Sequence, residues 1–239
     1  MLLFRSSALS GVVLVALAWA GTVDAQTVRV SAATSAGEAD LVDVSMLAPG
    51  VVPDMRYASA YNFTGAPVPG YTAPICLLLS PAARALAQVQ ADLKPQGMKL
   101  KLFDCYRPVR AVKRFMDWVN APSETRTKLE YHPHLEKAAL PGRYIASTSG
   151  HSRGATVDLT LLRCNALRCE ELDMGTPFDF FDPRANTDSA LVGPMQRQNR
   201  QLLLQAMSRR GFVNDPMEWW HFTLRPEPTP GMAYDVPVE

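Results

Sequence analysis

Two short motifs that lie far apart in the chain contain the side chains best suited to chemistry. The first runs from Ser149 to Asp158 and includes His151, and the second runs from Glu218 to His221. Together they supply two imidazoles and one carboxylate that could hold a metal ion, and a spare carboxylate that could act as acid or base. Catalytic zinc sites use three ligands of these types and leave a fourth position for water. These residues therefore predict a catalytic zinc site.

The elements around these motifs must bring the side chains together. Residues 155–162 are rich in β-branched and apolar types and predict a strand that contains Asp158. Gly154 can adopt backbone angles that other residues avoid, so we expect a bend there that leaves His151 on a turn. Residues 221–224 predict a last strand, which is entered irregularly after Pro216. A metal ion would lie where these elements converge.

Each motif residue also has a simpler interpretation. A single histidine such as His151 is more often a capping or hydrogen-bonded residue than a ligand, and a spacing of three, as between Glu218 and His221, is common by chance. Asp158 is harder to explain in this way, because a carboxylate among apolar strand residues is costly unless it is paired or bound to a metal. The combination therefore favours the zinc site.

These motifs resemble those of the VanX-type D-alanyl-D-alanine dipeptidases, which are grouped with zinc D,D-carboxypeptidases and the Hedgehog signalling domain. The family pattern is Ser-x-His-x-x-Gly-x-Ala-x-Asp followed by Glu-x-Trp-His, and Thr156 stands here at the alanine position. The resemblance covers about residues 40 to 238. It includes four further motifs: Asp54-Met55-Arg56-Tyr57, Asn62-Phe63-Thr64-Gly65, Asp104-Cys105-Tyr106-Arg107-Pro108 and Asp173-Met174-Gly175-Thr176-Pro177-Phe178-Asp179.

The resemblance implies a function for each matched residue. It implies one Zn²⁺ per chain, a catalytic base at Glu218, a transition-state arginine at Arg107, and the metal ligands His151, Asp158 and His221. It also implies four residues that line a dipeptide pocket: Tyr57, Tyr71, Ser149 and Asp179. These roles are chemically consistent, because Glu218 could move a proton from water to the leaving amine and Arg107 could stabilise an oxyanion.

The pocket residues also have structural alternatives. Arg107 could be a surface arginine before a proline, and Tyr57 and Tyr71 could simply pack as aromatic residues. Asp179 could cap a turn near Pro177. A site role for Asp179 is favoured because the free amine of a substrate needs an anion as its partner.

The first 25 residues have the features of a secretory signal. Arg5 precedes an apolar run over residues 8–20, and small residues follow at Val23 and Ala25. We therefore expect cleavage before Gln26, one domain over residues 26–239, and a secreted or periplasmic protein without stable membrane association. A retained anchor is the alternative.

Export would make the four cysteines candidates for disulfides. Four cysteines allow three pairings. Cys164 and Cys169 flank a short loop after the Asp158 strand, so their pairing is easy and would leave Cys76 to pair with Cys105. Free buried thiols are the alternative.

The remaining sequence predicts an α+β fold, with a small, central, mostly antiparallel sheet flanked by helices. Helices are expected over 81–96, 108–119 and 193–210, and a strand over 98–103. Residues 121–140 are expected to form a covering loop, whose His132 and His134 lie off the site. The charge is nearly balanced, with 24 Lys and Arg against 23 Asp and Glu, so nothing favours nucleic acid as a partner.

The sequence thus predicts zinc-dependent hydrolysis of free D-Ala-D-Ala to two D-alanines. The alternative enzyme is a D,D-carboxypeptidase or endopeptidase acting on peptidoglycan stem peptides, which would need an open groove. A dipeptidase would instead have a closed pocket, covered by residues 57–71 and 121–140. A metal-binding recognition module is a third possibility, which the presence of both Glu218 and Arg107 disfavours. The oligomeric state cannot be predicted.

Overall fold

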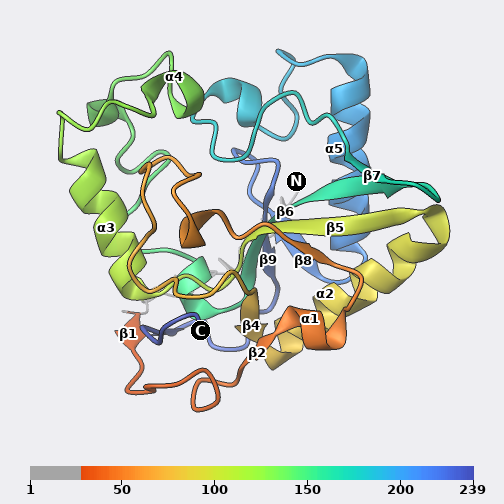
Figure 1. The fold of residues 1–239 in the computed structure, drawn as a ribbon, viewed down its shortest axis with the longest axis horizontal. Helices are drawn as coiled ribbons and strands as arrows, with labels where there is room; N and C mark the ends of the chain where they lie inside the picture. The colour runs from red at the N-terminus through yellow and green to blue at the C-terminus, as the bar shows by residue number, and fades with distance from the viewer. Residues whose placement is uncertain (1–27) are drawn as a thin grey trace, which may run out of the picture.

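The computed structural model describes residues 28–239, so the predicted signal over residues 1–25 lies outside the described part. Its centre is a six-stranded sheet in the order β3-β5-β6-β9-β8, with β7 also paired to β6 (Figure 1). Only β3 and β5 run parallel in this sheet, which confirms the predicted mostly antiparallel arrangement. The strands are β3 Val52–Pro53, β5 Met98–Asp104, β6 Thr156–Cys164, β7 Cys169–Glu171, β8 Phe212–Asn214 and β9 His221–Leu224.

Two small pairings complete the strands. β2 (Leu41–Asp43) runs antiparallel to β4 (Leu77–Leu79), and β1 (Arg29–Val30) runs parallel to β10 (Met232–Ala233). The chain end at Val238 forms a further bridge with Tyr71. Val238 is buried, donates its N–H to the Gly70 carbonyl at 2.8 Å, and accepts from the N–H groups of residues 72 and 73. The C-terminal residues therefore hold the segment that carries Tyr71.

Helix α2 (Ser80–Leu93) agrees with the helix predicted over residues 81–96. Pro81 occupies its first turn, where a missing N–H costs nothing. Its buried side chains follow the helical repeat and include Leu86, Val89 and Leu93. A 3₁₀ turn over Lys94–Gln96 extends the helix, and Gly97 ends it with a left-handed φ of 66°.

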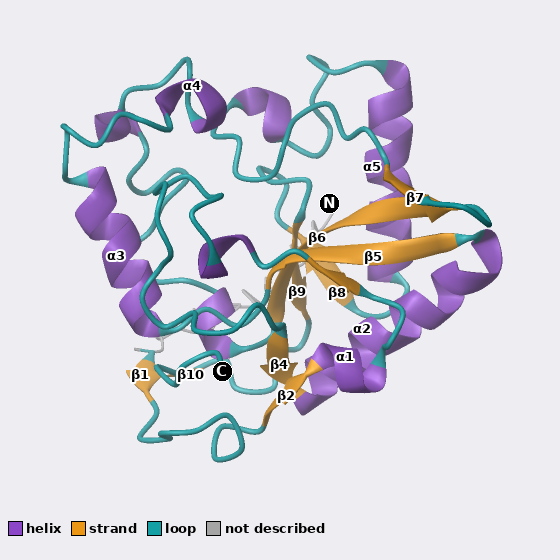
Figure 2. Ribbon diagram, viewed as in Figure 1, coloured by secondary structure: helices purple, strands orange, loops and turns teal. Residues whose placement is uncertain are grey.

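The other helices lie around the sheet, as Figures 1 and 2 show. α5 (Pro194–Ser208) packs against α2 and β8, α2 also packs against β5, and α3 (Val109–Val119) lies on the opposite side of the molecule. The short helices α1 and α4 cover Val44–Leu47 and Lys128–Tyr131. Phe115 of α3 packs against Tyr57 and Phe63, with ring centroids 4.8 and 4.7 Å away, so α3 supports the segment that contains Tyr57.

The structure contains both cysteine pairings that the spacing favoured. Cys76–Cys105 links the residue before β4 to the residue after β5, and Cys164–Cys169 closes the β6–β7 hairpin. Within residues 28–239, no helix is long and apolar enough to cross a membrane.

Candidate metal centre and substrate pocket

Strand pairing positions two of the three expected metal ligands. Asp158 on β6 lies directly opposite His221, the first residue of β9. His151 approaches from a 3₁₀ turn over His151–Arg153, which confirms the prediction that it lies on a turn. Gly154 ends this turn with a φ of 72°, and a Cβ there would lie 3.0 Å from the side chains of Leu41 and Leu79. A glycine is therefore needed where the chain bends from the turn into β6.

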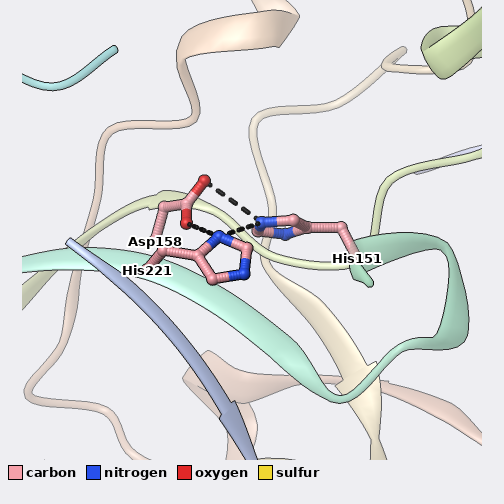
Figure 3. Close-up of side chains that lie close together, drawn as sticks. All are labelled: His151, Asp158 and His221. Atoms are coloured by element: carbon pink, nitrogen blue, oxygen red, sulfur yellow. Dashed lines mark hydrogen bonds and ion pairs between the residues drawn. The ribbon is translucent and has the colours of Figure 1, made fainter. Parts of the chain in front are cut away.

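The three side chains point toward a common position (Figure 3). His221 Nδ1 is 3.0 Å from Asp158 Oδ1, and His151 Nε2 is 3.2 Å from both Asp158 Oδ2 and His221 Nδ1. A tetrahedral zinc ion with bonds of about 2.0–2.1 Å would separate its ligands by about 3.3 Å. Asp158 Oδ1 is buried without a well-aligned hydrogen-bond donor. The donor set, its spacing and this unmatched oxygen fit a zinc ion.

The orientation of His151 is set by the backbone of Cys105. His151 Nδ1 lies 2.7 Å from the Cys105 carbonyl, to which it can donate only as N–H. Its Nε2 is then left with a lone pair that faces Asp158 and His221. A histidine ligand with its second nitrogen bound in this way is pre-oriented for a metal.

Arg107 is held beside the metal donors by Asp104. The fully buried Asp104 lies opposite Asp158 across the β5–β6 pair. Arg107 Nε and Nη2 both lie 2.9 Å from Asp104 Oδ2, and Nη2 is 3.7 Å from Asp158 Oδ2. Asp104 was not predicted as a site residue, although its position at the end of a strand and three residues before Arg107 was a usable signal.

Tyr71 does not line the cavity, contrary to the prediction. It is buried behind Tyr57, and its hydroxyl donates to Asp104 Oδ1 at 2.6 Å. The carboxylate of Asp104 thus accepts from Tyr71 on one oxygen and from Arg107 on the other. Tyr71 therefore acts on the site through Asp104 and Arg107.

Asp179 is held in an unusual conformation at the pocket wall. Its φ is 60°, a left-handed value that costs a residue with a Cβ some energy. Its carboxylate is buried and accepts from the Tyr57 hydroxyl at 2.8 Å. Burial raises the pKa of this carboxyl well above its ordinary value, and the nearby charge of Asp158 adds to the shift. A cation at this position would offset the cost of burying the carboxylate.

The loop that carries Asp179 is tied to α5 by one buried side chain. Arg200 is 1% exposed, and it donates from Nε to the Met174 carbonyl at 2.8 Å and from Nη1 to the Asn186 carbonyl at 2.6 Å. Trp219 adds a third tie, because its indole N–H donates to Thr176 at 2.8 Å. Residues 174–186 therefore have a defined path although much of this segment is irregular.

Glu218 lies on the turn that leads into β9. Its N–H donates to the Asp215 carbonyl at 3.1 Å, and Asn214 Nδ2 donates to the carbonyls of Glu218 and His221 at 3.0 and 2.9 Å. Glu218 Oε2 is 3.5 Å from His221 Nδ1, beside the donor set. Burial raises the pKa of the Glu218 carboxyl to about 7, with His221 opposing the shift.

These residues line one cavity of about 380 Å³, a size typical of small-molecule sites. The predicted residues at its surface are Tyr57, Arg107, Ser149, His151, Asp158, Asp179, Glu218 and His221. Prediction missed Phe115, Arg143, Tyr144, Ile145, Phe181, Asp215 and Met217, which also line it. No repeated motif marks them, because they reach the cavity through tertiary contacts.

The predicted cover of the pocket is partly wrong. Tyr57 and Phe63 do come from residues 57–71, but the lining contains no described residue from 121–140. Residues 142–150 form that wall instead. His132 and His134 are turned to other partners, since their Nδ1 atoms lie 2.9 Å from the Leu135 carbonyl and 3.0 Å from Asp182, respectively.

The three converging donors fit the metal centre of a metallopeptidase. A family model described as D-Ala-D-Ala dipeptidase matches residues 37–239, and the chain belongs to that family.

Several relatives align with most of the chain. The D-alanyl-D-alanine dipeptidase of Enterococcus faecium is 39% identical over 80% of this chain and 94% of its own length. The enzyme of the same name from Streptomyces coelicolor is 39% identical over 83% and 98%, and that from Escherichia coli is 34% identical over 77% and 84%. Among solved structures, a mutant of the vancomycin-resistance D,D-pentapeptidase VanY in complex with Zn(II) aligns with 14% identity and a TM-score of 0.38, over 62% of this chain and 73% of that one.

Proposed function

We propose that this enzyme hydrolyses free D-Ala-D-Ala to two D-alanines with one Zn²⁺ held by His151, Asp158 and His221. The observation that carries the proposal is that a carboxylate able to bind an amine, Asp179, faces the same cavity as the three converging donors. The relatives that align over most of this chain are named for the same activity. When bound, zinc supplies Lewis acidity that polarises the peptide carbonyl and lowers the pKa of water toward about 7.

Glu218 would move the protons of the reaction. Its Oε2 lies beside the donor set, 3.5 Å from His221 Nδ1, and it is not needed as a ligand because three others are in place. It can take a proton from the attacking water and deliver it to the nitrogen of the leaving D-alanine. Burial raises the pKa of this carboxyl to about 7, and a group whose pKa lies near neutral pH can both accept and release a proton.

Arg107 and Asp179 would bind opposite charges. Arg107 lies beside the donor set with its orientation held by Asp104, so its guanidinium can stabilise the oxyanion that forms at the scissile carbonyl. Asp179, held by Tyr57, would bind the free amine of the substrate. That amine lies one residue from the scissile bond in a dipeptide but not in a stem peptide. Asp179 would therefore select free dipeptides over longer stem peptides.

The test compares substrates on the zinc-loaded protein. Release of free alanine is measured from D-Ala-D-Ala, L-Ala-L-Ala, N-acetyl-D-Ala-D-Ala and a stem pentapeptide, and Glu218→Gln serves as the control that keeps its zinc. We expect rapid turnover of D-Ala-D-Ala alone and a loss of about 10²–10⁴-fold in the variant. Equal cleavage of the blocked dipeptide or the pentapeptide would instead establish the peptidoglycan carboxypeptidase.

We further propose that residues 1–25 are removed on export and that residues 26–239 act as one domain in a secreted or periplasmic setting. The apolar run over residues 8–20 and the two disulfides support this. N-terminal sequencing of the mature protein is the test, and an intact Met1 would reject it.

A further inference from the structure

The turn over residues 140–145 presents two donors to the cavity that the proposed mechanism does not use. Arg143 and Tyr144 both line the cavity. The Arg143 guanidinium carbon lies 5.3 Å from the centroid of the Tyr144 ring, so the two side chains are neighbours on one wall. A catalytic role for either is not needed, which leaves substrate binding to be considered.

Among the described residues, neither donor is matched by a carboxylate or a carbonyl acceptor. Across residues 28–239, Arg143 makes no ion pair with a carboxylate, whereas the other arginine of the cavity, Arg107, is matched by Asp104. The Tyr144 hydroxyl is buried and has no hydrogen-bond partner among the described residues. Burial also raises its pKa, so the hydroxyl stays protonated and remains a donor. A buried hydroxyl without a hydrogen-bond partner is costly, which indicates that a ligand or a water molecule accepts its hydrogen bond.

The turn that presents these donors is held by backbone hydrogen bonds and buried side chains. Gly142 takes a left-handed φ of 76°, and its N–H donates to the Ile145 carbonyl at 2.9 Å. The Tyr144 N–H donates to the Leu140 carbonyl at 2.9 Å, and the side chains of Leu140 and Ile145 are buried. The Tyr144 ring packs against Phe181, with centroids 5.6 Å apart. The turn backbone and the Tyr144 ring are therefore held in place before a ligand arrives, which lowers the entropy cost of binding.

The charge of the cavity makes a cation at this wall necessary for an anionic ligand. Four acidic side chains line it, namely Asp158, Asp179, Asp215 and Glu218, and they would repel a carboxylate. Asp158 would be neutralised by a metal and Asp179 by the substrate amine, but Asp215 and Glu218 remain. Arg143 is the lining arginine whose charge is not already matched by a protein carboxylate.

We propose that Arg143 and Tyr144 bind the C-terminal carboxylate of the substrate. The proposal rests on the proposed function, since a free dipeptide is a zwitterion whose two ends need opposite partners. Asp179 would take the amine, and the Arg143–Tyr144 pair would take the carboxylate through a charge-assisted hydrogen bond and a hydroxyl hydrogen bond. The enzyme would then require a free carboxyl terminus as well as a free amine.

The test compares D-Ala-D-Ala with its C-terminal amide, which has the same shape but no negative charge. kcat and KM are measured for both with the wild-type enzyme, Arg143→Met, Arg143→Lys and Tyr144→Phe. Arg168→Met is the matched control, because Arg168 is exposed on the β6–β7 turn and does not line the cavity. Zinc content is measured for each protein so that loss of metal is not mistaken for loss of binding.

We expect Arg143→Met to raise KM for the acid about tenfold with little change in kcat, and to change KM for the amide less than about twofold. Arg143→Lys should retain part of the preference, Tyr144→Phe should lose about threefold on the acid only, and Arg168→Met should match the wild type. Added salt should reduce the preference of the wild type for the acid, because this rim charge is partly exposed.

Equal losses on acid and amide, or no loss on either, would overturn the carboxylate subsite while leaving the dipeptidase function in place. A wild-type enzyme that cleaves the amide as well as the acid would overturn it too. A wild-type enzyme inactive on D-Ala-D-Ala would overturn the proposed function and this inference together.

Discussion

The three candidate metal donors and Asp179, the carboxylate proposed to bind the substrate amine, face one cavity but are positioned by different means. Asp158 and His221 sit opposite each other on the paired strands β6 and β9, so the backbone ladder sets their separation. Asp179 sits on a long irregular loop with a left-handed backbone, and buried Arg200 ties that loop to α5. The first arrangement is distributed over many backbone bonds, and the second depends on a few side chains.

Because of this difference, we expect zinc binding by the metal donors and substrate binding at Asp179 to be lost independently. Disturbing the loop should weaken substrate binding and leave the metal donors intact, because the β6–β9 backbone pairing includes no residue of 174–186. Removing a metal donor should abolish turnover while the loop keeps its path. The following variants test that separation, in order of expected effect.

The largest effect is expected at the metal donors. His151→Ala, Asp158→Asn and His221→Ala should each lose stoichiometric zinc and more than about 10⁴-fold in turnover, because activation of water and of the carbonyl is lost together. Zinc content by inductively coupled plasma analysis and far-UV circular dichroism check the prediction. A variant that keeps its zinc, or one whose sheet unfolds, would show that these residues have another role.

Asp179→Asn should cost about 30–100-fold in kcat/KM on D-Ala-D-Ala, because a bound amine would lose its buried counter-charge. The amide of asparagine can still accept from Tyr57, so the pocket should keep its shape. Zinc content should not change, and slow cleavage of N-acetyl-D-Ala-D-Ala should be unaffected. An equal loss on both substrates would mean that Asp179 does not bind the amine.

Arg200→Met should raise KM for D-Ala-D-Ala about tenfold without loss of zinc, because the carbonyls of Met174 and Asn186 lose their donor and the Asp179 loop is loosened. The free energy of unfolding should fall by only about 1–3 kcal/mol, since burial of the guanidinium is itself costly. Gln198→Met, on an exposed position of the same helix, is the control. A change confined to stability, with KM unaltered, would reduce Arg200 to a structural residue.

The smallest effect is expected at the Cys164–Cys169 disulfide, which closes a short hairpin away from the cavity. Replacing both residues by serine should cost about 2 kcal/mol of unfolding free energy and leave kcat and KM unchanged.

The Cys76–Cys105 bond closes a longer loop and should contribute about 3.5 kcal/mol. Its loss should also weaken zinc binding, because the Cys105 carbonyl orients His151. Denaturant titrations measure the loss of stability in each double-serine variant, and a zinc competition assay tests whether only the loss of Cys76–Cys105 weakens zinc binding.

The same contrast explains what could be predicted from the sequence. The metal donors, the turn at His151 and helix α2 follow from local features, namely motif spacing, a glycine, and apolar residues at the helical repeat. The α+β fold and the strands β5, β6 and β9 were also predicted from local patterns, whereas the shorter strands were not predicted individually.

The contents of the pocket wall were less predictable. Tyr71 was expected in the cavity, but its hydroxyl is bound to Asp104, a contact between segments that no local pattern reveals. Arg200 and Tyr144 are ordinary residues in the sequence and gain their importance only when distant segments meet them. The cover was placed at 121–140 because that region is polar, whereas the wall is formed by the turn that follows it.

The bridge between Val238 and Tyr71 has a consequence for protein engineering. Val238 is almost at the end of the chain, yet its backbone holds residues 70–73, and Tyr71 in turn reaches Asp104 and, through it, Arg107. Deleting residues 238 and 239 would therefore free the Tyr71 side chain, whose hydroxyl bonds the Asp104 carboxylate that holds Arg107. Glu239 is exposed, so a purification tag or fusion partner joined after it has room. The backbone of Val238 is therefore as important to the position of Arg107 as residues much nearer the cavity.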